Sequence, residues 1–305
     1  MRLAERTRLF GPRQSLVAVL TEPPPAVGRA ERPAVILLNA GMLHRVGPNR
    51  VHVRLARKLA AAGFVVMRFD YSGIGDSRPR EDALPFAAAA VEETRQAMDF
   101  LAESRGTTRF VLFGICSGAD NALRVAGQDP RVVGAALIDP YNLPTVARVL
   151  HMYSNRLLSL RSWRRLLTGR SLVWSSARTA RSLQRAASAS NDGYASLLPS
   201  REEYVAQVSR LAQRGVALYL LYTGESPGYV NYRRLLRKPI RRWPWGNRIR
   251  MEYLRQSDHV FTLLSSQAGL LGAVEDWLAG CFPAGPSDPS TPAPLPSATP
   301  VPKLA

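Results

Sequence analysis

The sequence predicts an α/β protein with a mostly parallel, eight-stranded sheet that carries helices on both faces. Short apolar runs alternate with segments of helical periodicity along most of the chain. This alternation is typical of a parallel sheet covered by helices. With 305 residues, 46% of them hydrophobic, the chain also has enough apolar material for one large core. These observations predict one domain over residues 1–282.

The elements follow from periodicity and from the turn residues between them. Gly11-Pro12 predicts a tight turn between the first two strands, and Gly63 closes the first helix, whose apolar face carries Val51, Leu55 and Leu59. Strands are expected at Leu3–Phe10, Ser15–Thr21, Ala34–Leu38, Phe64–Phe69, Phe110–Phe113, Val133–Ile138, Val216–Tyr222 and Arg248–Leu254. Helices are expected at Val51–Ala62, Phe86–Ser104, Ala119–Gly127, Glu202–Arg214 and Leu263–Leu278.

Two segments interrupt this pattern. Residues 143–199 lack strand periodicity and carry arginine, tryptophan, leucine and serine at helix-like spacing, which predicts a helical insertion that forms a lid over the sheet. Residues 283–305 contain eight prolines, and such a composition predicts a disordered tail.

The net charge of +18 is concentrated in two clusters. Residues 148–185 hold nine arginines and no acidic residue, and a second basic cluster runs from Arg233 to Arg255. Such a field favours anionic partners, and a membrane surface or an acyl carrier is the expected one. A solvated basic face is the alternative. Nucleic-acid binding is not favoured, although Trp163 and Trp174 lie among the arginines.

The remaining composition indicates a cytoplasmic protein. Two cysteines cannot build a disulfide framework, the N-terminus lacks the apolar run of a signal peptide, and no run of 18 uncharged apolar residues occurs. Peripheral contact with the inner membrane face follows only if the basic clusters bind lipid. Without CxxC or paired-histidine spacing, neither a metal nor a cofactor is expected.

The strongest local motif is Gly114-Ile115-Cys116-Ser117-Gly118, which lies between a predicted strand and a predicted helix. A nucleophile held in a sharp strand-to-helix turn needs small residues two positions before and after it. Gly114 and Gly118 meet this condition for Cys116, whereas a turn centred on Ser117 would place Ile115 at a crowded position. Cys116 is therefore the candidate nucleophile, and a thiol at a helix N-terminus is readily activated. A buried, unreactive Cys116 is the structural alternative.

His259 is the candidate general base. It follows the last predicted strand, so it should lie at the same carboxyl edge of the sheet as Cys116. The other histidines, His44, His52 and His151, lie in less suitable places. Two backbone N–H groups should stabilise an oxyanion, one from Ser117 and one from the loop after the third strand, where Met42 is the expected donor.

Together these motifs resemble the α/β-hydrolase superfamily. The segment Asp70–Ser77 (DYSGIGDS) is similar to the family's D-x-R-G-x-G-x-S, with Ser72 in place of arginine. Residues 39–77 and the elbow are most similar to the hydrolases associated with bacterial exosortase A and exopolysaccharide gene clusters, which also carry cysteine in the elbow. Asn39-Ala40-Gly41 replaces the family's common His-Gly.

The resemblance implies the position of the acid and the reaction. The family places the acid after the strand Val216–Tyr222, which makes Glu225 the first candidate, in place of the more usual aspartate, and Asp139 the alternative. The implied reaction is hydrolysis of an ester, thioester or amide of a small-molecule acyl substrate through an acyl-cysteine and a Cys-His-Glu triad. An acyltransferase with the same triad, and a non-catalytic binding protein of the same fold, remain alternatives.

Overall fold

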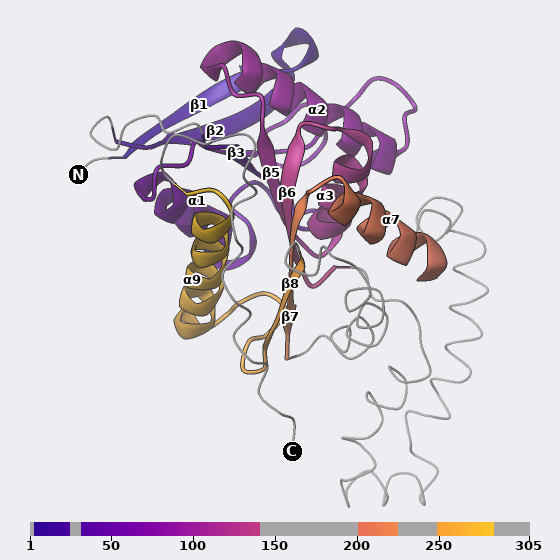
Figure 1. Cartoon of the computed structure of the whole chain (residues 1–305). Helices are drawn as coiled ribbons and strands as arrows, with labels where there is room; N and C mark the ends of the chain where they lie inside the picture. Colours follow the sequence, from indigo (N-terminus) through magenta and orange to yellow (C-terminus); the bar gives the residue numbers. More distant parts are fainter. Residues whose placement is uncertain (1–2, 25–31, 141–200, 225–248, 284–305) are drawn as a thin grey trace, which may run out of the picture.

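A computed structural model describes residues 3–24, 32–140, 201–224 and 249–283 of the chain (Figure 1). The expected insertion over 143–199, the expected tail over 283–305 apart from its first residue, Glu225 and almost all of both basic clusters lie outside these residues.

The core is one eight-stranded sheet with the strand order β1-β2-β4-β3-β5-β6-β7-β8. β1 and β2 form an antiparallel hairpin, β2 pairs antiparallel with β4, and all other neighbours are parallel. The predicted fold class is therefore confirmed. The strands are β1 Ala4–Phe10, β2 Leu16–Glu22, β3 Ala34–Leu37, β4 Val66–Phe69, β5 Phe110–Ile115, β6 Val132–Ile138, β7 Ala217–Thr223 and β8 Ile249–Leu254.

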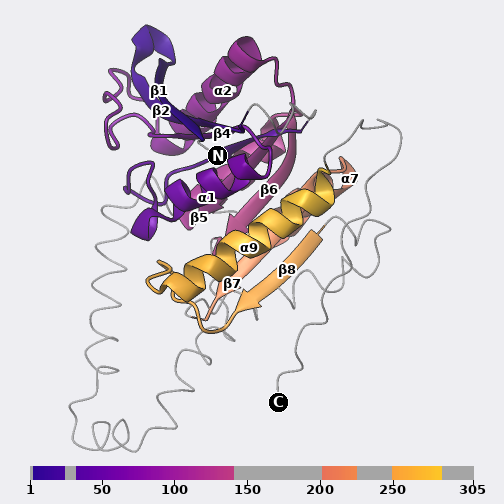
Figure 2. The same ribbon diagram turned by 90° about the vertical axis from the view of Figure 1, so that its left-hand side faces the viewer.

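Helices cover both faces of this sheet (Figures 1 and 2). One face packs against α1 and α9, which lie side by side in Figure 2, and the other packs against α2, α3 and α7. The helices are α1 Val51–Ala61, α2 Phe86–Arg105, α3 Ser117–Gln128, α7 Arg201–Gln213 and α9 Leu264–Cys281, with short 3-10 turns at Pro12–Gln14 and Pro48–Arg50.

The alternation of side chains along a strand creates two separate cores. In β3, Val35 and Leu37 pack toward α1 and α9, whereas Ala34 and Ile36 pack toward α2 and α3. All four residues are buried, as expected of a central strand covered on both faces.

The strand order reverses around β3, which lies between β4 and β5. Ligands of open α/β sheets bind at the carboxyl ends of the strands, at such a reversal. The loops after β3, β5 and β6 meet there. Leu38 N donates to Phe113 O, and Cys116 N donates to Ile138 O at 2.9 Å.

Candidate active site

Cys116 occupies a strained turn between β5 and α3. Its φ of 56° and ψ of −125° lie in a region that side-chain-bearing residues rarely adopt. The carbonyl of Cys116 accepts hydrogen bonds from Ala119 N and Asp120 N, which begin the helix immediately after the turn. The thiol thus lies at a helix N-terminus. Cys116 is solvent-exposed, so the alternative of a buried Cys116 with a purely structural role does not apply.

Gly114 and Gly118 are required by the close approach of neighbouring backbone. A Cβ atom on Gly114 would lie 2.1 Å from the carbonyl carbon of Gly118, and one on Gly118 would lie 2.5 Å from Asn39 O. Any larger residue would push the elbow apart or displace the end of β3. Both glycines thus stand at the two crowded positions that the sequence predicts for a turn centred on Cys116.

His259 links the nucleophile to a carboxylate. Its Nδ1 lies 2.9 Å from Asp139 Oδ2, and the Cys116 side chain is close enough to the ring to help raise its pKa. Since Nδ1 faces the carboxylate, Nε2 is the ring nitrogen left for the thiol. The structure therefore brings Cys116, His259 and Asp139 together at the carboxyl ends of β5, β8 and β6.

Asp139 is held firmly for this contact. It follows β6 directly with a φ of 44°, and its N–H donates to Leu221 O of β7. Thr223, at the end of β7, donates from its backbone N–H to Oδ1 at 2.8 Å and from its hydroxyl to Oδ2 at 2.6 Å. Together with His259, these donors satisfy a carboxylate that is almost fully buried.

The acid preferred from the sequence was Glu225, and this assignment needs correction. The contact with His259 Nδ1 is made by Asp139, the second choice, while Glu225 lies outside the described residues. The physical reason is local: the left-handed conformation of Asp139 turns its side chain toward the loop that carries His259. Periodicity indicated that both residues follow a strand, but it could not report the positive φ of Asp139 or its contact with His259.

The site strongly favours the protonated imidazole. Hydrogen bonds to Asp139 and to Cys116, supported by the charges of both groups, raise the pKa of His259 from 6.5 to about 10 despite partial burial. The ring is therefore an imidazolium at neutral pH. That form stabilises an adjacent thiolate and can later donate a proton.

The expected oxyanion donors, Ser117 N and Met42 N, belong to two segments that are joined by a hydrogen bond. Among the described residues, neither Ser117 N nor Met42 N donates to the protein. Gly41 N, by contrast, donates to Ser117 Oγ at 2.9 Å. This bond fastens the loop after β3 to the start of α3, so the hydroxyl of Ser117 holds the two donor segments together.

A buried network fixes the other end of this loop. Asn39 Nδ2 donates to Leu43 O at 2.8 Å and to Asp70 Oδ1 at 3.2 Å, and Tyr71 N donates to Asn39 Oδ1 at 2.9 Å. The guanidinium and the backbone N–H of Arg45 also bind the Asp70 carboxylate. Asn39 therefore does more than replace a family histidine. The sequence did not indicate that Asn39 links the loop after β3 to Asp70 and Tyr71, although Asn39 and Asp70 follow neighbouring parallel strands.

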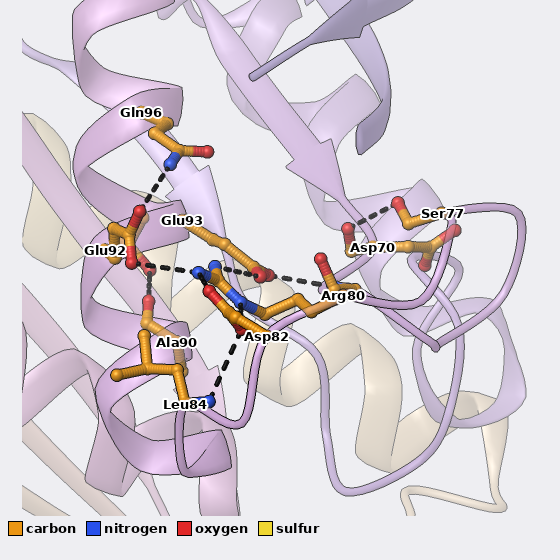
Figure 3. Close-up of polar contacts among 11 residues, drawn as sticks. Asp70, Ser77, Arg80, Asp82, Leu84, Ala90, Glu92, Glu93 and Gln96 are labelled. Atoms are coloured by element: carbon orange, nitrogen blue, oxygen red, sulfur yellow. Dashed lines mark hydrogen bonds and ion pairs between the residues drawn. The ribbon is translucent and has the colours of Figure 1, made fainter. Parts of the chain in front are cut away.

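The loop after β4 is anchored to α2 (Figure 3). Ser77 Oγ donates to Asp70 O at 2.6 Å, and the Arg80 guanidinium reaches Asp82, Glu92 and the buried Glu93. A hollow of about 500 Å³ lies beside this cluster, but none of Cys116, Asp139 and His259 lines it. This hollow is therefore not the catalytic site.

The described residues contain no group of three His, Cys, Asp or Glu side chains placed to hold a metal ion. None of the helices within the described ranges is long and apolar enough to span a membrane.

Comparison with known proteins agrees with the fold. A family model described as serine aminopeptidase, S33, matches residues 31–195. No curated protein matches the sequence.

Solved structures with a similar fold include three proteins of low sequence identity. An esterase from Pyrococcus furiosus has 12% identity and a TM-score of 0.57, with 93% of this chain and 92% of that chain covered. An α/β serine hydrolase without lid from Xanthomonas campestris has 15% identity and a TM-score of 0.54, with 94% and 98% covered. A proline iminopeptidase from Mycobacterium smegmatis has 16% identity and a TM-score of 0.51, with 90% and 97% covered.

Proposed function

The chain is an α/β hydrolase of the serine aminopeptidase S33 family, and we propose that it cleaves esters, thioesters or amides through the thiol of Cys116. The observation that carries the proposal is the linked set of contacts from Cys116 to His259 and from His259 to Asp139. The resemblance of the elbow to hydrolases that carry cysteine at this position supports it as well.

The family is that of the serine aminopeptidases, but the elbow of this chain has Cys116 at its centre. The adjacent Ser117 is not placed to act as the nucleophile instead. Ser117 is the first residue of α3, and its hydroxyl accepts the hydrogen bond from Gly41 N. The strained backbone and the contact with His259 both belong to Cys116. These features favour Cys116 over Ser117 as the attacking group.

In the reacting form of the proposed site, the proton is on His259 and the negative charge is on Cys116, because the thiolate is the nucleophile. The thiolate attacks the carbonyl carbon of the substrate, and the carbonyl oxygen becomes an oxyanion that accepts hydrogen bonds from Ser117 N and Met42 N. His259 then donates its proton to the leaving group as the bond to that group breaks. The product of this half-reaction is an acyl-cysteine with a neutral His259.

The second half-reaction returns the site to its starting state. Neutral His259 takes a proton from water as the water oxygen attacks the thioester carbonyl. The tetrahedral intermediate collapses with departure of the Cys116 thiolate, the carboxylic acid is released, and His259 keeps the proton. Asp139 holds the ring orientation throughout and stabilises its charged form.

Covalent labelling tests the proposal directly. A Cys281→Ser background leaves Cys116 as the single cysteine. After brief reaction with p-nitrophenyl acetate and an acid quench, peptide mass spectrometry should find one acetyl group on Cys116. Ser117→Ala in the same background serves as the matched control and should still be acetylated, whereas Cys116→Ala and His259→Ala should not. Acetylation of Ser117, or turnover by Cys116→Ala, would contradict the proposal.

A further inference from the structure

Exposed apolar side chains lie on the segments that carry the expected oxyanion donor and the base. Eight large hydrophobic residues are exposed in the described chain; four of them lie on the two loops that carry Met42 and His259, and a fifth, Leu264, begins α9 directly after the second loop. We define these five as the apolar rim: Met42 (77% exposed), Leu43 (46%), Val260 (43%), Leu263 (60%) and Leu264 (65%). Isolated exposed leucines are common on proteins, but a group on the segments that carry the expected oxyanion donor and the base calls for an explanation.

The two loops of the rim are joined. Asn49 Nδ2, beyond the first loop, donates to Val260 O at 2.9 Å. Arg54 of α1 donates to Gln267 of α9, whose own amide donates to Phe261 O at 2.9 Å. The rim therefore belongs to one connected surface; Met42 carries the expected oxyanion donor, and Val260 directly follows the base.

The second loop is folded so that its leucines stay outside. Phe261 is fully buried with a φ of 54°, and Asp258 holds the turn by accepting hydrogen bonds from the N–H and the hydroxyl of Thr262. Leu263 occupies the N-cap of α9 and makes no side-chain cap. Serine, threonine, asparagine or aspartate would stabilise the helix at that position. Neither helix stability nor core packing thus accounts for Leu263 and Leu264.

The charged neighbours of the rim are engaged elsewhere. Asp258 binds Thr262, and Arg45 binds Asp70 and Asp76. The five rim side chains themselves carry no charge and offer no strong hydrogen-bonding group. The surface is therefore suited to a hydrocarbon group rather than to an anion or a polar peptide.

We infer that the apolar rim binds the hydrocarbon chain of the acyl donor, so that the substrates are esters or thioesters of medium-chain or longer fatty acids. This inference rests on the proposed function, because the chain must be attached to the carbonyl that Cys116 attacks. Each methylene that contacts the rim should raise kcat/KM by roughly two- to fourfold, given the free energy of burying a CH₂ group.

Chain-length profiles of paired variants test the inference. Wild-type protein should cleave soluble p-nitrophenyl decanoate with a higher kcat/KM than the acetate ester, below the concentration at which the substrate aggregates. The double change Leu263→Gln/Leu264→Gln should lower the decanoate value by about tenfold or more while leaving acetate nearly unchanged, as expected for the loss of a few methylene contacts. Leu9→Gln is the matched control, because Leu9 is 50% exposed on β1 at the far edge of the sheet.

A second measurement does not depend on turnover. In the Cys281→Ser background, decanoate should protect Cys116 from alkylation by iodoacetamide far better than acetate, and the double leucine variant should lose this protection.

Failures of the two proposals are distinguishable. If Cys116 is acetylated but neither rate nor protection depends on chain length, the inference about the rim is wrong and the nucleophile stands. A length effect seen only with aggregated substrate or vesicles would also overturn the inference, because the rim would then meet a lipid surface. If no donor acylates Cys116, the proposed function itself is wrong.

Discussion

The hydroxyl of Ser117 accepts a hydrogen bond from the backbone N–H of Gly41 at 2.9 Å, across the gap between the end of β3 and the start of α3. This contact ties together the two segments that are expected to supply the oxyanion donors. It also gives Ser117 a role that requires its oxygen but no nucleophilic attack.

We therefore predict that Ser117→Ala lowers kcat/KM by about fivefold, which corresponds to the loss of one hydrogen bond of about 1 kcal/mol. Cys116→Ala should abolish turnover of the same ester. Steady-state kinetics of the two variants check this, with circular dichroism to confirm that both are folded. A dead Ser117→Ala beside an active Cys116→Ala would reverse the roles of these neighbours.

The acid is tested by a second pair of variants. Asp139→Asn should lower kcat/KM by roughly 10²- to 10⁴-fold, as loss of the acid does in Ser-His-Asp sites, because His259 loses the carboxylate that holds its charged form. Glu225→Gln should change kcat/KM far less, because the contact with His259 Nδ1 is made by Asp139. The two changes are matched in chemistry, since each converts a carboxylate into its amide. A larger loss in Glu225→Gln than in Asp139→Asn would restore the original assignment.

Much of the fold could be predicted because its signals are local. The fully buried strand β3 follows from a short continuous apolar run, and the apolar face of α1 follows from a period of 3.6 residues. Boundaries at the elbow were less accurate. β5 extends to Ile115, two residues beyond the prediction, because Ile115 pairs with Ile138 of β6. The helix begins at Ser117 rather than Ala119 because it starts as soon as the strained turn ends.

The sequence indicates candidate site residues where a steric requirement falls on neighbouring residues, and it does not report contacts between distant ones. The two glycines of the elbow indicate Cys116 directly. The choice between Asp139 and Glu225 depends on a positive φ and on Thr223, which lies 84 residues from Asp139 in the chain. Likewise, the contact between Asn39 and Asp70 joins residues 31 positions apart. No periodicity reports such contacts.

The titration of His259 gives a third prediction. Because its pKa is raised to about 10, kcat/KM should fall as pH rises through about 10, where the proton for the leaving group is lost. In Asp139→Asn the fall should begin at a distinctly lower pH, since the largest cause of the shift is removed. The stabilisation of the fold by this group has the same sign: it is complete below pH 6.5 and is lost as pH rises through about 10. If the pH profiles of the two proteins do not differ, Asp139 does not raise the pKa of the His259 ring that limits the rate.

His52 gives the last prediction, which concerns stability at acid pH. Its ring is fully buried on α1, edge-on to Phe113 at 5.7 Å between centroids, and neither ring nitrogen has a partner among the described residues. Burial, aided by the charge of Arg68, lowers the pKa of His52 to about 3. The folded protein therefore binds this proton less readily than the unfolded chain, so stability is lost as pH falls from 6.5 toward 3. At pH 5 the loss amounts to about 2 kcal/mol, at 1.36 kcal/mol for each unit below 6.5.

Replacing His52 by leucine should remove this loss. Buried carboxylates such as Asp129 also destabilise the fold in acid. Burial alone would raise the pKa of Asp129, but pairing with Arg131 outweighs it and lowers that pKa. Only the difference between the two proteins therefore reports on His52. Urea unfolding at pH 7 should give His52→Leu a free energy of unfolding equal to or above that of the wild type, because no hydrogen bond is lost. At pH 5 the variant should be the more stable protein by about 2 kcal/mol. If the difference stays constant between pH 7 and pH 5, His52 is not the neutral, unpaired ring that the structure describes.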